Sequence, residues 1–351
     1  MKYTPNYELK KPEQDDFYNV EDFNENADII DQALKAHDDA LATKETTAGA
    51  QAKAEAAAAA AVAAHDTNVA AHGGIYRKNL LHNWDFRNPV NQRGQSSYSV
   101  SNYTIDRWRT NDASISVNIN SGYITVSNNG AAEKHFLQQL EFMVPGDYTV
   151  SLLLANGDIL SESLNVNDSV AGGSGGSSVK SLTAGLRVQI GDFSSKPAFK
   201  LLIAPGYSFN IVAIKLELGS VSTLANDPPA DFGEELRKCQ RYLFNAIDTP
   251  ASGVGAALGT GIALSATEIR ILLPIPAHMR SIAATVILSS PSHFQCVGAS
   301  TLNISALAYG ATSSNSVMLI ATVTGATPGQ SYYLRRATGA TDGHLLISKE
   351  L

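Results

Sequence analysis

The residues best suited to bind a ligand form a short run, Tyr-Tyr-Leu-Arg-Arg, at positions 332–336. Aromatic rings stack on sugar faces, and guanidinium groups bind phosphate or carboxylate. Tyr332, Tyr333, Arg335 and Arg336 are therefore candidate ligand-binding residues. The run has the composition of a β-strand, so only one of the two tyrosines can face a given side. In the alternative interpretation, one tyrosine belongs to the core and the arginines solubilise an edge strand.

Two histidines could form a metal or anion site. His65 and His72 lie one heptad apart in a segment with helical periodicity. In a trimer of helices each would form a ring of three imidazoles on the axis. The alternative is a polar layer that fixes the register, or partly solvated rings at a helix end. We expect no other metal site and no cofactor, because Cys239 and Cys296 are isolated and typical of buried thiols rather than of zinc ligands or a disulfide.

No recognisable combination of catalytic residues is present. Glycoside hydrolysis needs two carboxylates about 5–10 Å apart. The carboxylates that follow residue 235 are few and in no recognisable context: Asp248, Glu268, Asp342 and Glu350. Neither H-E-x-x-H nor G-x-S-x-G occurs, and no internal repeat suggests the β-helix of a depolymerase. We therefore expect a binding protein and not an enzyme.

The elements that must position these residues differ between the two ends of the chain. Between residues 27 and 72 the sequence is rich in alanine and has a three-four spacing, with Ile30, Leu34 and Leu41 as its apolar seam. A single alanine-rich helix buries little area and is marginally stable alone, so we expect it to associate with copies of itself as a coiled coil. Residues 1–26 carry several aromatic side chains among acidic ones. They are either a segment that docks on a larger assembly or a short helical cap on the stalk.

From residue 75 onward, short β-branched runs alternate with Gly, Asn, Ser and Pro turns. The sequence predicts a mainly β fold with an N-terminal α-helical coiled-coil stalk at 27–74 and two antiparallel β-sandwich or jelly-roll domains. The first, at 75–230, is similar to carbohydrate-binding domains. The second, at 231–351, consists of a short helix and a C-terminal tip domain.

Several residues are expected to be structural. Trp84, Phe86 and Trp108 lie in strand-like phrases, where packing in a core is favoured over stacking on a sugar. The neighbours Asp106 and Arg107 are expected to be part of a structural ion pair and not of a catalytic site. In the helix at 234–244, the side chains that could face a core are Leu236, Tyr242 and Leu243.

The formal net charge of −7 is spread along the chain, which argues against nucleic acid or an anionic membrane as the partner. No apolar run reaches the roughly 20 residues that cross a bilayer, so we expect no membrane insertion. The first residues contain no apolar segment typical of a secretory signal. These features indicate a protein that is made in the cytoplasm.

Four phrases of the sequence resemble the distal part of phage and prophage tail fibres. They are NLLHNWDF at 79–86, YTIDRW at 103–108, KLELGS at 215–220 and EELRKCQRYLF at 234–244. In such fibres the patterns N-L-L-x-N-x-D-F, Y-x-x-D-R-W, K-L-E-x-G-S and E-E-L-x-x-C-Q-R-Y recur in this order.

Two further segments extend the resemblance. Residues 17–31 are similar to the particle-proximal start of such fibres, so the match touches the start, the middle and the last third of the chain. Residues 274–280 (PIPAHMR) resemble the fibre phrase L-P-x-P-M-R, but Ala277 and His278 are inserted before the Met.

The resemblance implies a homotrimeric tail-fibre protein of a virion or of a phage-tail-like bacteriocin. Such a protein would be made in the host cytoplasm, bind baseplate or tail proteins through residues 1–26, and attach distally to a host cell-wall glycan. It implies no particular binding residue. The alternatives are a baseplate or fibre spacer without receptor binding, and a cell-wall glycan depolymerase.

Overall fold

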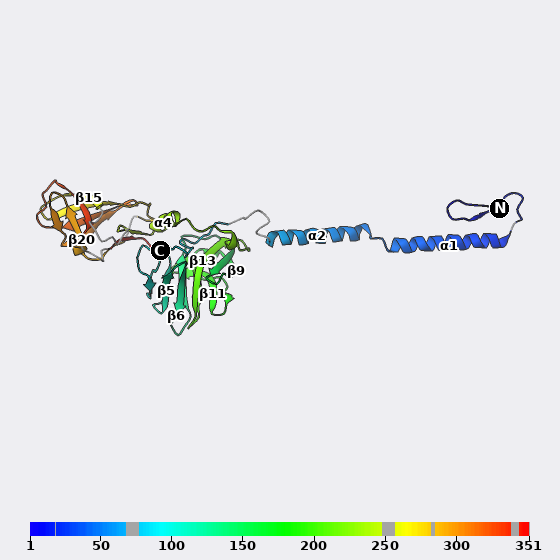
Figure 1. Cartoon of the computed structure of the whole chain (residues 1–351), viewed down its shortest axis with the longest axis horizontal. Coiled ribbons are helices and arrows are strands. Elements are labelled where there is room, and N and C mark those ends of the chain that lie inside the picture. The colour runs from blue at the N-terminus through cyan, green and yellow to red at the C-terminus, as the bar shows by residue number, and fades with distance from the viewer. Residues whose placement is uncertain (18, 68–76, 248–256, 282–284, 338–343, 351) are drawn as a thin grey trace. The chain divides into compact units, whose positions relative to one another are not determined.

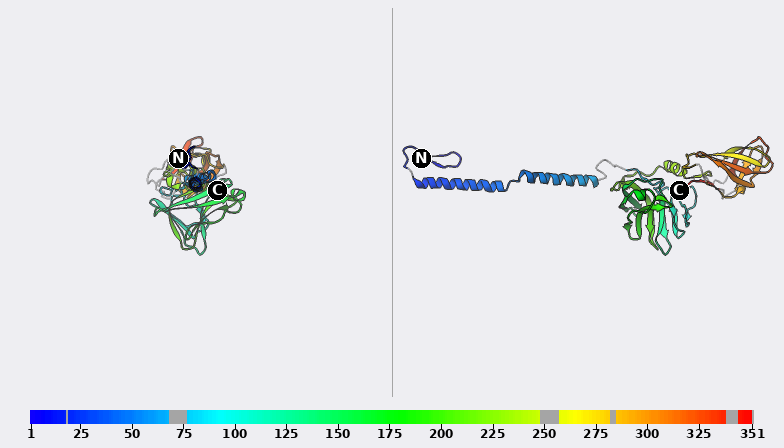
Figure 2. Two further views of the ribbon diagram at one scale, coloured as in Figure 1. Left: turned by 90° about the vertical axis from the view of Figure 1, so that its right-hand side faces the viewer. Right: turned by 180° about the vertical axis from the view of Figure 1, so that it is seen from behind.

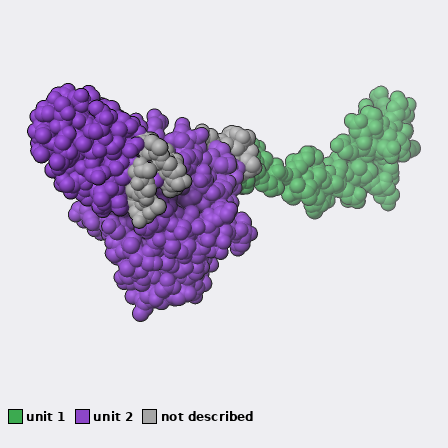
Figure 3. All heavy atoms as spheres, turned by 60° about the vertical axis from the view of Figure 1, so that its left-hand side comes forward, with its two compact units in different colours: residues 1–71 green, residues 72–351 purple. Residues whose placement is uncertain are grey.

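The computed structural model describes residues 1–17, 19–67, 77–247, 257–281, 285–337 and 344–350 (Figure 1). Its contacts divide the chain into two compact units, residues 1–71 and residues 72–351 (Figure 3). The first unit is helical apart from one short hairpin, and the second is built almost entirely from strands. Every strand pairing in the described residues is antiparallel, so the predicted mainly β fold with N-terminal helix is confirmed.

The first unit contains two helices, α1 (Val20–Ala42) and α2 (Thr47–Thr67), and not one continuous helix (Figure 2). The interruption covers residues 43–46, which begin and end with the β-branched residues Thr43 and Thr46. Thr43 ends α1 with its hydroxyl bonded to the Ala40 carbonyl, and Thr46 Oγ1 accepts a hydrogen bond from Gly49 N at the start of α2. These side chains satisfy the backbone groups that a helix end leaves without partners.

No residue of α1 is buried, and its apolar seam is open to solvent. Ile30, Leu34 and Leu41 are 46%, 60% and 50% exposed. A row of apolar side chains that no described residue of the chain buries is typical of a helix with a missing partner. The coiled coil itself stays a prediction.

The N-terminal residues form a β-hairpin, not the short helical cap considered above. Strands β1 (Lys2–Tyr3) and β2 (Lys10–Lys11) pair, and Asn26 of α1 exchanges two hydrogen bonds with the backbone of Lys10, at 2.6 and 2.7 Å. The Lys10 ammonium also pairs with Asp22 and Glu25, and its hydrogen bonds to these carboxylates raise its pKa. The hairpin is therefore fixed to the first turns of α1.

The first β region, which we define as residues 77–240, contains two sheets. The five-stranded sheet has the order β10 (Lys180–Thr183), β11 (Leu186–Phe193), β12 (Lys196–Ile203), β7 (Lys134–Gln139) and β4 (Arg109–Thr110). The six-stranded sheet has the order β3 (Ser97–Tyr98), β5 (Ile115–Asn120), β6 (Tyr123–Asn128), β13 (Ser208–Leu218), β8 (Gly146–Leu154) and β9 (Ile159–Val166). Helices α3 (Asp168–Ala171) and α4 (Phe232–Gln240) and the 3-10 turn η1 (Leu224–Asn226) complete it.

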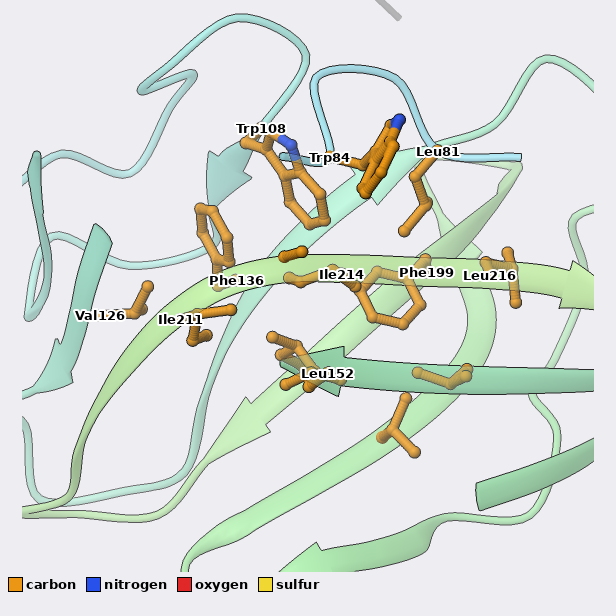
Figure 4. Close-up of a cluster of buried hydrophobic side chains, with 14 of the residues drawn as sticks. Leu81, Trp84, Trp108, Val126, Phe136, Leu152, Phe199, Ile211, Ile214 and Leu216 are labelled. Carbon is orange, nitrogen blue, oxygen red and sulfur yellow. The ribbon is translucent and has the colours of Figure 1, made fainter. Parts of the chain in front are cut away.

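Side chains of both sheets form one hydrophobic core (Figure 4). Trp108 stacks on Phe136 of β7 with ring centroids 4.7 Å apart, and Phe199 of β12 meets it edge-on. Trp84, Phe86 and Trp108 are all buried, so the prediction that they pack in a core is confirmed. Two sheets around a common core fit the predicted sandwich, whereas the jelly-roll arrangement stays a prediction.

The four phrases that carry the tail-fibre resemblance meet one another in space. Asn79 accepts a hydrogen bond from Leu216 N, which joins the first phrase to the third. Asn83 is buried in a left-handed conformation (φ 53°); its N–H donates to Glu235 at 2.6 Å, and its carbonyl accepts from Trp108 Nε1 at 2.8 Å. These bonds join the first phrase to the fourth and the second. The phrases are thus mutual structural partners.

The second β region, residues 243–350, has a separate hydrophobic core. Its three-stranded sheet has the order β14 (Leu243–Asn245), β23 (Leu345–Ser348) and β17 (Thr285–Leu288). Its seven-stranded sheet has the order β19 (Thr301–Asn303), β18 (Phe294–Val297), β22 (Ser331–Arg336), β15 (Ala257–Ala263), β16 (Glu268–Pro274), β21 (Ser316–Thr322) and β20 (Ala306–Thr312). The 3-10 turn η2 (Pro291–His293) precedes β18.

Buried and partly buried polar contacts join the two β regions. The Gln92 side chain donates to Leu243 O at 2.6 Å and accepts from Asn245 N at 3.1 Å. Glu350 of the second region pairs with Arg107 at 3.0 Å and with Arg93 at 3.1 Å, and the side chains of Glu350 and Arg107 are only 6% and 2% exposed. We call Arg93, Arg107 and Glu350 the junction cluster.

The junction cluster corrects the expected role of two neighbours. Asp106 and Arg107 are both in structural ion pairs, but not with each other. Asp106 is fully buried, lies 3.7 Å from Arg93 and accepts a hydrogen bond from Gln92 N. Burial raises the pKa of Asp106 to about 7, against the opposing effect of Arg93. Arg107 has a positive φ of 70°, a backbone conformation that few residues other than glycine adopt.

Two further expectations have clear outcomes. Cys239 and Cys296 are free, buried thiols, as predicted. Tyr242 and Leu243 are buried, as predicted. Leu236 is only partly buried, because the buried face of α4 carries Glu235 and Cys239. Among the described helices, none is both long and apolar enough to cross a membrane.

Candidate functional site: a cleft in the first β region

The sequence-predicted ligand residues lie on β22, an interior strand between β18 and β15. Tyr332 is 2% exposed and packs in the core, where its hydroxyl accepts a hydrogen bond from Thr327 N. It therefore cannot stack on a ligand at the surface. Arg336, on the same side of the strand, is also buried. The proposed edge-strand role of the arginines is wrong because β22 is paired on both sides.

Tyr333 and Arg335 share the other face of β22 and are half-buried. Arg335 donates a hydrogen bond to Gln295 of β18 at 3.2 Å. The strand thus divides the four candidates into two pairs on opposite faces, as the alternation of strand side chains requires. Only the pair Tyr333 and Arg335 remains available as a ligand surface.

The histidine site is only partly within the described structure. His65 lies near the end of α2 on an exposed position, whereas His72 lies outside the described residues. Among the residues that the structure describes, no group of three or more His, Cys, Asp or Glu side chains could hold a metal ion. The imidazole rings expected in a trimer stay a prediction.

A cleft that bears several functional groups lies mainly in the first β region, beside α4, and has a volume of about 410 Å³. Its lining comes from five separate stretches of chain: residues 78–82, Arg107, residues 138–148, Leu218 and residues 238–242. The sheets supply the rigid walls, because β7 ends at Gln139, β8 contributes Tyr148 and β13 ends at Leu218.

One wall of the cleft is apolar and open to solvent. Phe142 is 78% exposed, and Val144 and Leu218 are 50% and 51% exposed. Phe142 and Val144 belong to the loop between β7 and β8, and Tyr148 fixes this loop through a 2.7 Å hydrogen bond from its hydroxyl to Val144 O. An exposed aromatic ring beside a cleft is typical of a binding surface.

The cleft also has cationic lining residues, which we call its cationic wall. Lys78, Arg107, Lys238 and Arg241 line the cleft, and Glu141 is the one carboxylate among the lining residues that the structure describes. Glu141 Oε1 accepts hydrogen bonds from the Tyr242 hydroxyl at 2.6 Å and from Arg241 at 3.3 Å.

Arg107 is more buried than Lys238 and Arg241, with 2% of its side chain exposed against 36% and 43%. Its guanidinium carbon lies 3.6 Å from the centroid of the Tyr242 ring, and it donates to Gln139 O at 2.7 Å. This stacking arrangement holds both the cation and the ring in place. The junction cluster therefore also supports the cleft.

The pKa of His82 depends on burial and on the cations that line the cleft. Its pKa is lowered to about 3, first by burial and then by Arg107, Lys238 and Arg241. Its Nδ1 is shielded from water and has no hydrogen-bond partner within the described structure. The ring lies beside Tyr242, with centroids 5.8 Å apart. Burial is therefore the main reason that this imidazole is neutral, and the nearby cations add to the effect.

Sequence reasoning missed this cleft because its lining residues come from distant parts of the chain. Two signals were present. Arg107, Arg241 and Tyr242 belong to the phrases that resemble tail fibres, and the run Phe142-Met143-Val144 places apolar residues directly before a Pro-Gly turn. Neither signal identifies a cleft until the fold brings the segments together.

No protein-family model matches this chain, and a search of curated proteins finds no significant match.

Proposed function

We propose that the chain is a receptor-binding tail-fibre protein of a phage or of a phage-tail-like particle, and that a homotrimer attaches the particle to host cell-surface polysaccharide. Its N-terminal segment would bind tail or baseplate proteins. The four sequence phrases, the open apolar seam of α1 and the cleft in the first β region support this proposal. The exposed ring of Phe17, at 96% exposure, and those of Tyr7 and Phe23 offer a docking surface at the N-terminal end.

The observation that carries the binding function is the cleft itself, with its exposed aromatic wall and its cationic wall. Hydrolysis of a glycan needs two carboxylates across the sugar site. The described lining of the cleft contains only Glu141, which is engaged by Tyr242 and Arg241. Binding without catalysis is therefore favoured over a depolymerase.

We expect the full-length chain to bind saturably to purified cell walls of at least one species in a panel of bacteria. Removal of the wall polysaccharide should abolish this binding. The measurement is sedimentation of the protein with the walls over a concentration series, and released reducing sugar is assayed in the same samples. A folded chain that binds no wall would support the spacer alternative, and released sugar would support the depolymerase.

We also expect the chain to sediment as a trimer, with three times the chain mass of 37.2 kDa. The double variant Leu34→Ser/Leu41→Ser should shift it to the monomer, because it removes seam residues that are half or more exposed in a single chain. The control, Gln32→Ser/Ala36→Ser, changes the opposite face of α1. Analytical ultracentrifugation distinguishes these results. A wild-type monomer at micromolar concentration, or equal dissociation of both variants, would contradict the prediction.

A further inference from the structure

The charge of the cleft differs from that of the chain. The whole sequence has a net charge of −7, yet cations dominate the surface of the cleft. Lys78 is exposed, and the side chains of Lys238 and Arg241 are 36% and 43% exposed. These three cations reach solvent.

The carboxylates near these cations are much less accessible. The partner of Lys238 is Glu235, which is 6% exposed and also accepts a hydrogen bond from Asn83 N. Glu350, the partner of Arg107, is equally buried, and Glu141 is 29% exposed. An arriving ligand therefore meets mainly positive charge, and the lowered pKa of His82 agrees with this.

The apolar wall indicates that the ligand also has an apolar surface. The Phe142 ring projects into solvent at 78% exposure beside Leu218 and Val144. Sugars have polar edges and apolar C–H faces, and the faces pack on aromatic rings. Inorganic anions and simple acids would use only the cationic wall, whereas a neutral glycan would use only the aromatic one.

We propose that the cleft binds an anionic sugar unit of a glycan, with its carboxylate or phosphate at Lys78, Lys238 and Arg241 and one C–H face on Phe142. The inference rests on the proposed polysaccharide-binding function and specifies its ligand. Charge complementarity selects the anionic unit over a neutral one, and the exposed ring selects a sugar over a free anion.

The test is titration calorimetry on the full-length chain with three probes: trigalacturonic acid, glucose 1-phosphate and the neutral trisaccharide maltotriose. We expect at least one anionic probe to bind, and its affinity to fall at higher ionic strength. Lys78→Gln and Arg241→Gln should each weaken that binding by about three- to tenfold, as is typical of partly exposed charge pairs. Phe142→Ala should weaken the binding of the same probe by a larger factor than either cation variant. The two anionic probes distinguish a carboxylate from a phosphate as the recognised group.

Matched controls lie outside the cleft. Lys180→Gln removes an exposed lysine of β10, and Tyr309→Ala removes a ring on β20 that is 47% exposed. Both should leave the affinity unchanged, and circular dichroism should show that every variant is folded.

Three results would overturn the inference. Equal binding of maltotriose with no effect of the cation variants would show a neutral-sugar site and keep the proposed function. Binding to cell walls by a chain that binds none of the probes, and whose wall binding is unaffected by Phe142→Ala, would place recognition elsewhere. A chain that binds neither walls nor probes would overturn both the inference and the function.

Discussion

Replacement of Glu350 by alanine is expected to lower the free energy of unfolding of the first β region by about 3–5 kcal/mol. The change leaves the Arg107 guanidinium buried at 2% exposure without its carboxylate. Arg93 would lose the same partner. Removal of one member of a buried pair is costly because the Arg107 guanidinium stays buried, and its hydrogen bond to Gln139 O and its stacking on Tyr242 do not replace the lost negative charge.

Both tryptophans lie in the core of the first β region, so intrinsic fluorescence during urea unfolding reports this region. The control is Glu133→Ala, which breaks the pair with Arg187, whose side chain is 48% exposed. It should cost at most about 1 kcal/mol. Equal losses in the two variants would show that the junction cluster contributes no more than a surface ion pair.

Lys215→Met is expected to destabilise the first β region by a similar amount, about 3–5 kcal/mol at neutral pH. Lys215 is fully buried; its ammonium lies 2.5 Å from Asp227 and 3.7 Å from Glu217, which is also fully buried. Methionine retains most of the side-chain volume and removes the charge. The variant therefore leaves two buried carboxylates without a cation.

The loss should depend on pH, and its sign follows from Asp227. Burial raises the pKa of this carboxyl above its usual range, and Lys215 opposes the rise. Without Lys215 the folded-state pKa rises further above that of the unfolded chain. Such a group contributes stability below its unfolded pKa and loses it as the pH rises through the folded pKa. The deficit of the variant should thus shrink between pH 7 and about pH 4.

The same fluorescence-monitored urea unfolding, repeated across this pH range, measures the deficit. Lys134→Met is the control, since it removes a cation that is 25% exposed and whose partner Asp112 is 35% exposed. A deficit that stays constant with pH, or that matches the control, would contradict the prediction.

The helical segment shows what periodicity can and cannot predict. A three-four spacing predicts helix over residues 27–72, and α1 and α2 occupy most of this range. The spacing does not predict the interruption, because hydrophobic periodicity contains no information on capping side chains such as Thr43 and Thr46. Those residues were readable signals of a helix end.

The ligand residues show a different limit. Strand alternation predicts that Tyr332 and Tyr333 face opposite sides, and they do. It does not predict which one is buried, because that depends on where the strand packs. The ion-pair partner of Arg107 could not be predicted from the sequence either. Asp106 is its neighbour in sequence, but the carboxylate that pairs with Arg107 is that of Glu350. Long-range contacts decide both cases.

The junction cluster also has a consequence for biosynthesis. Glu350 is separated from Arg107 by 243 positions in the sequence. At typical translation rates, the ribosome takes on the order of 10–50 s to make that stretch. During this interval the nascent first β region holds Arg93 and Arg107 without their carboxylate. We expect the part of the first β region around Arg107 to be less stable, and open to chaperones, until Glu350 is made.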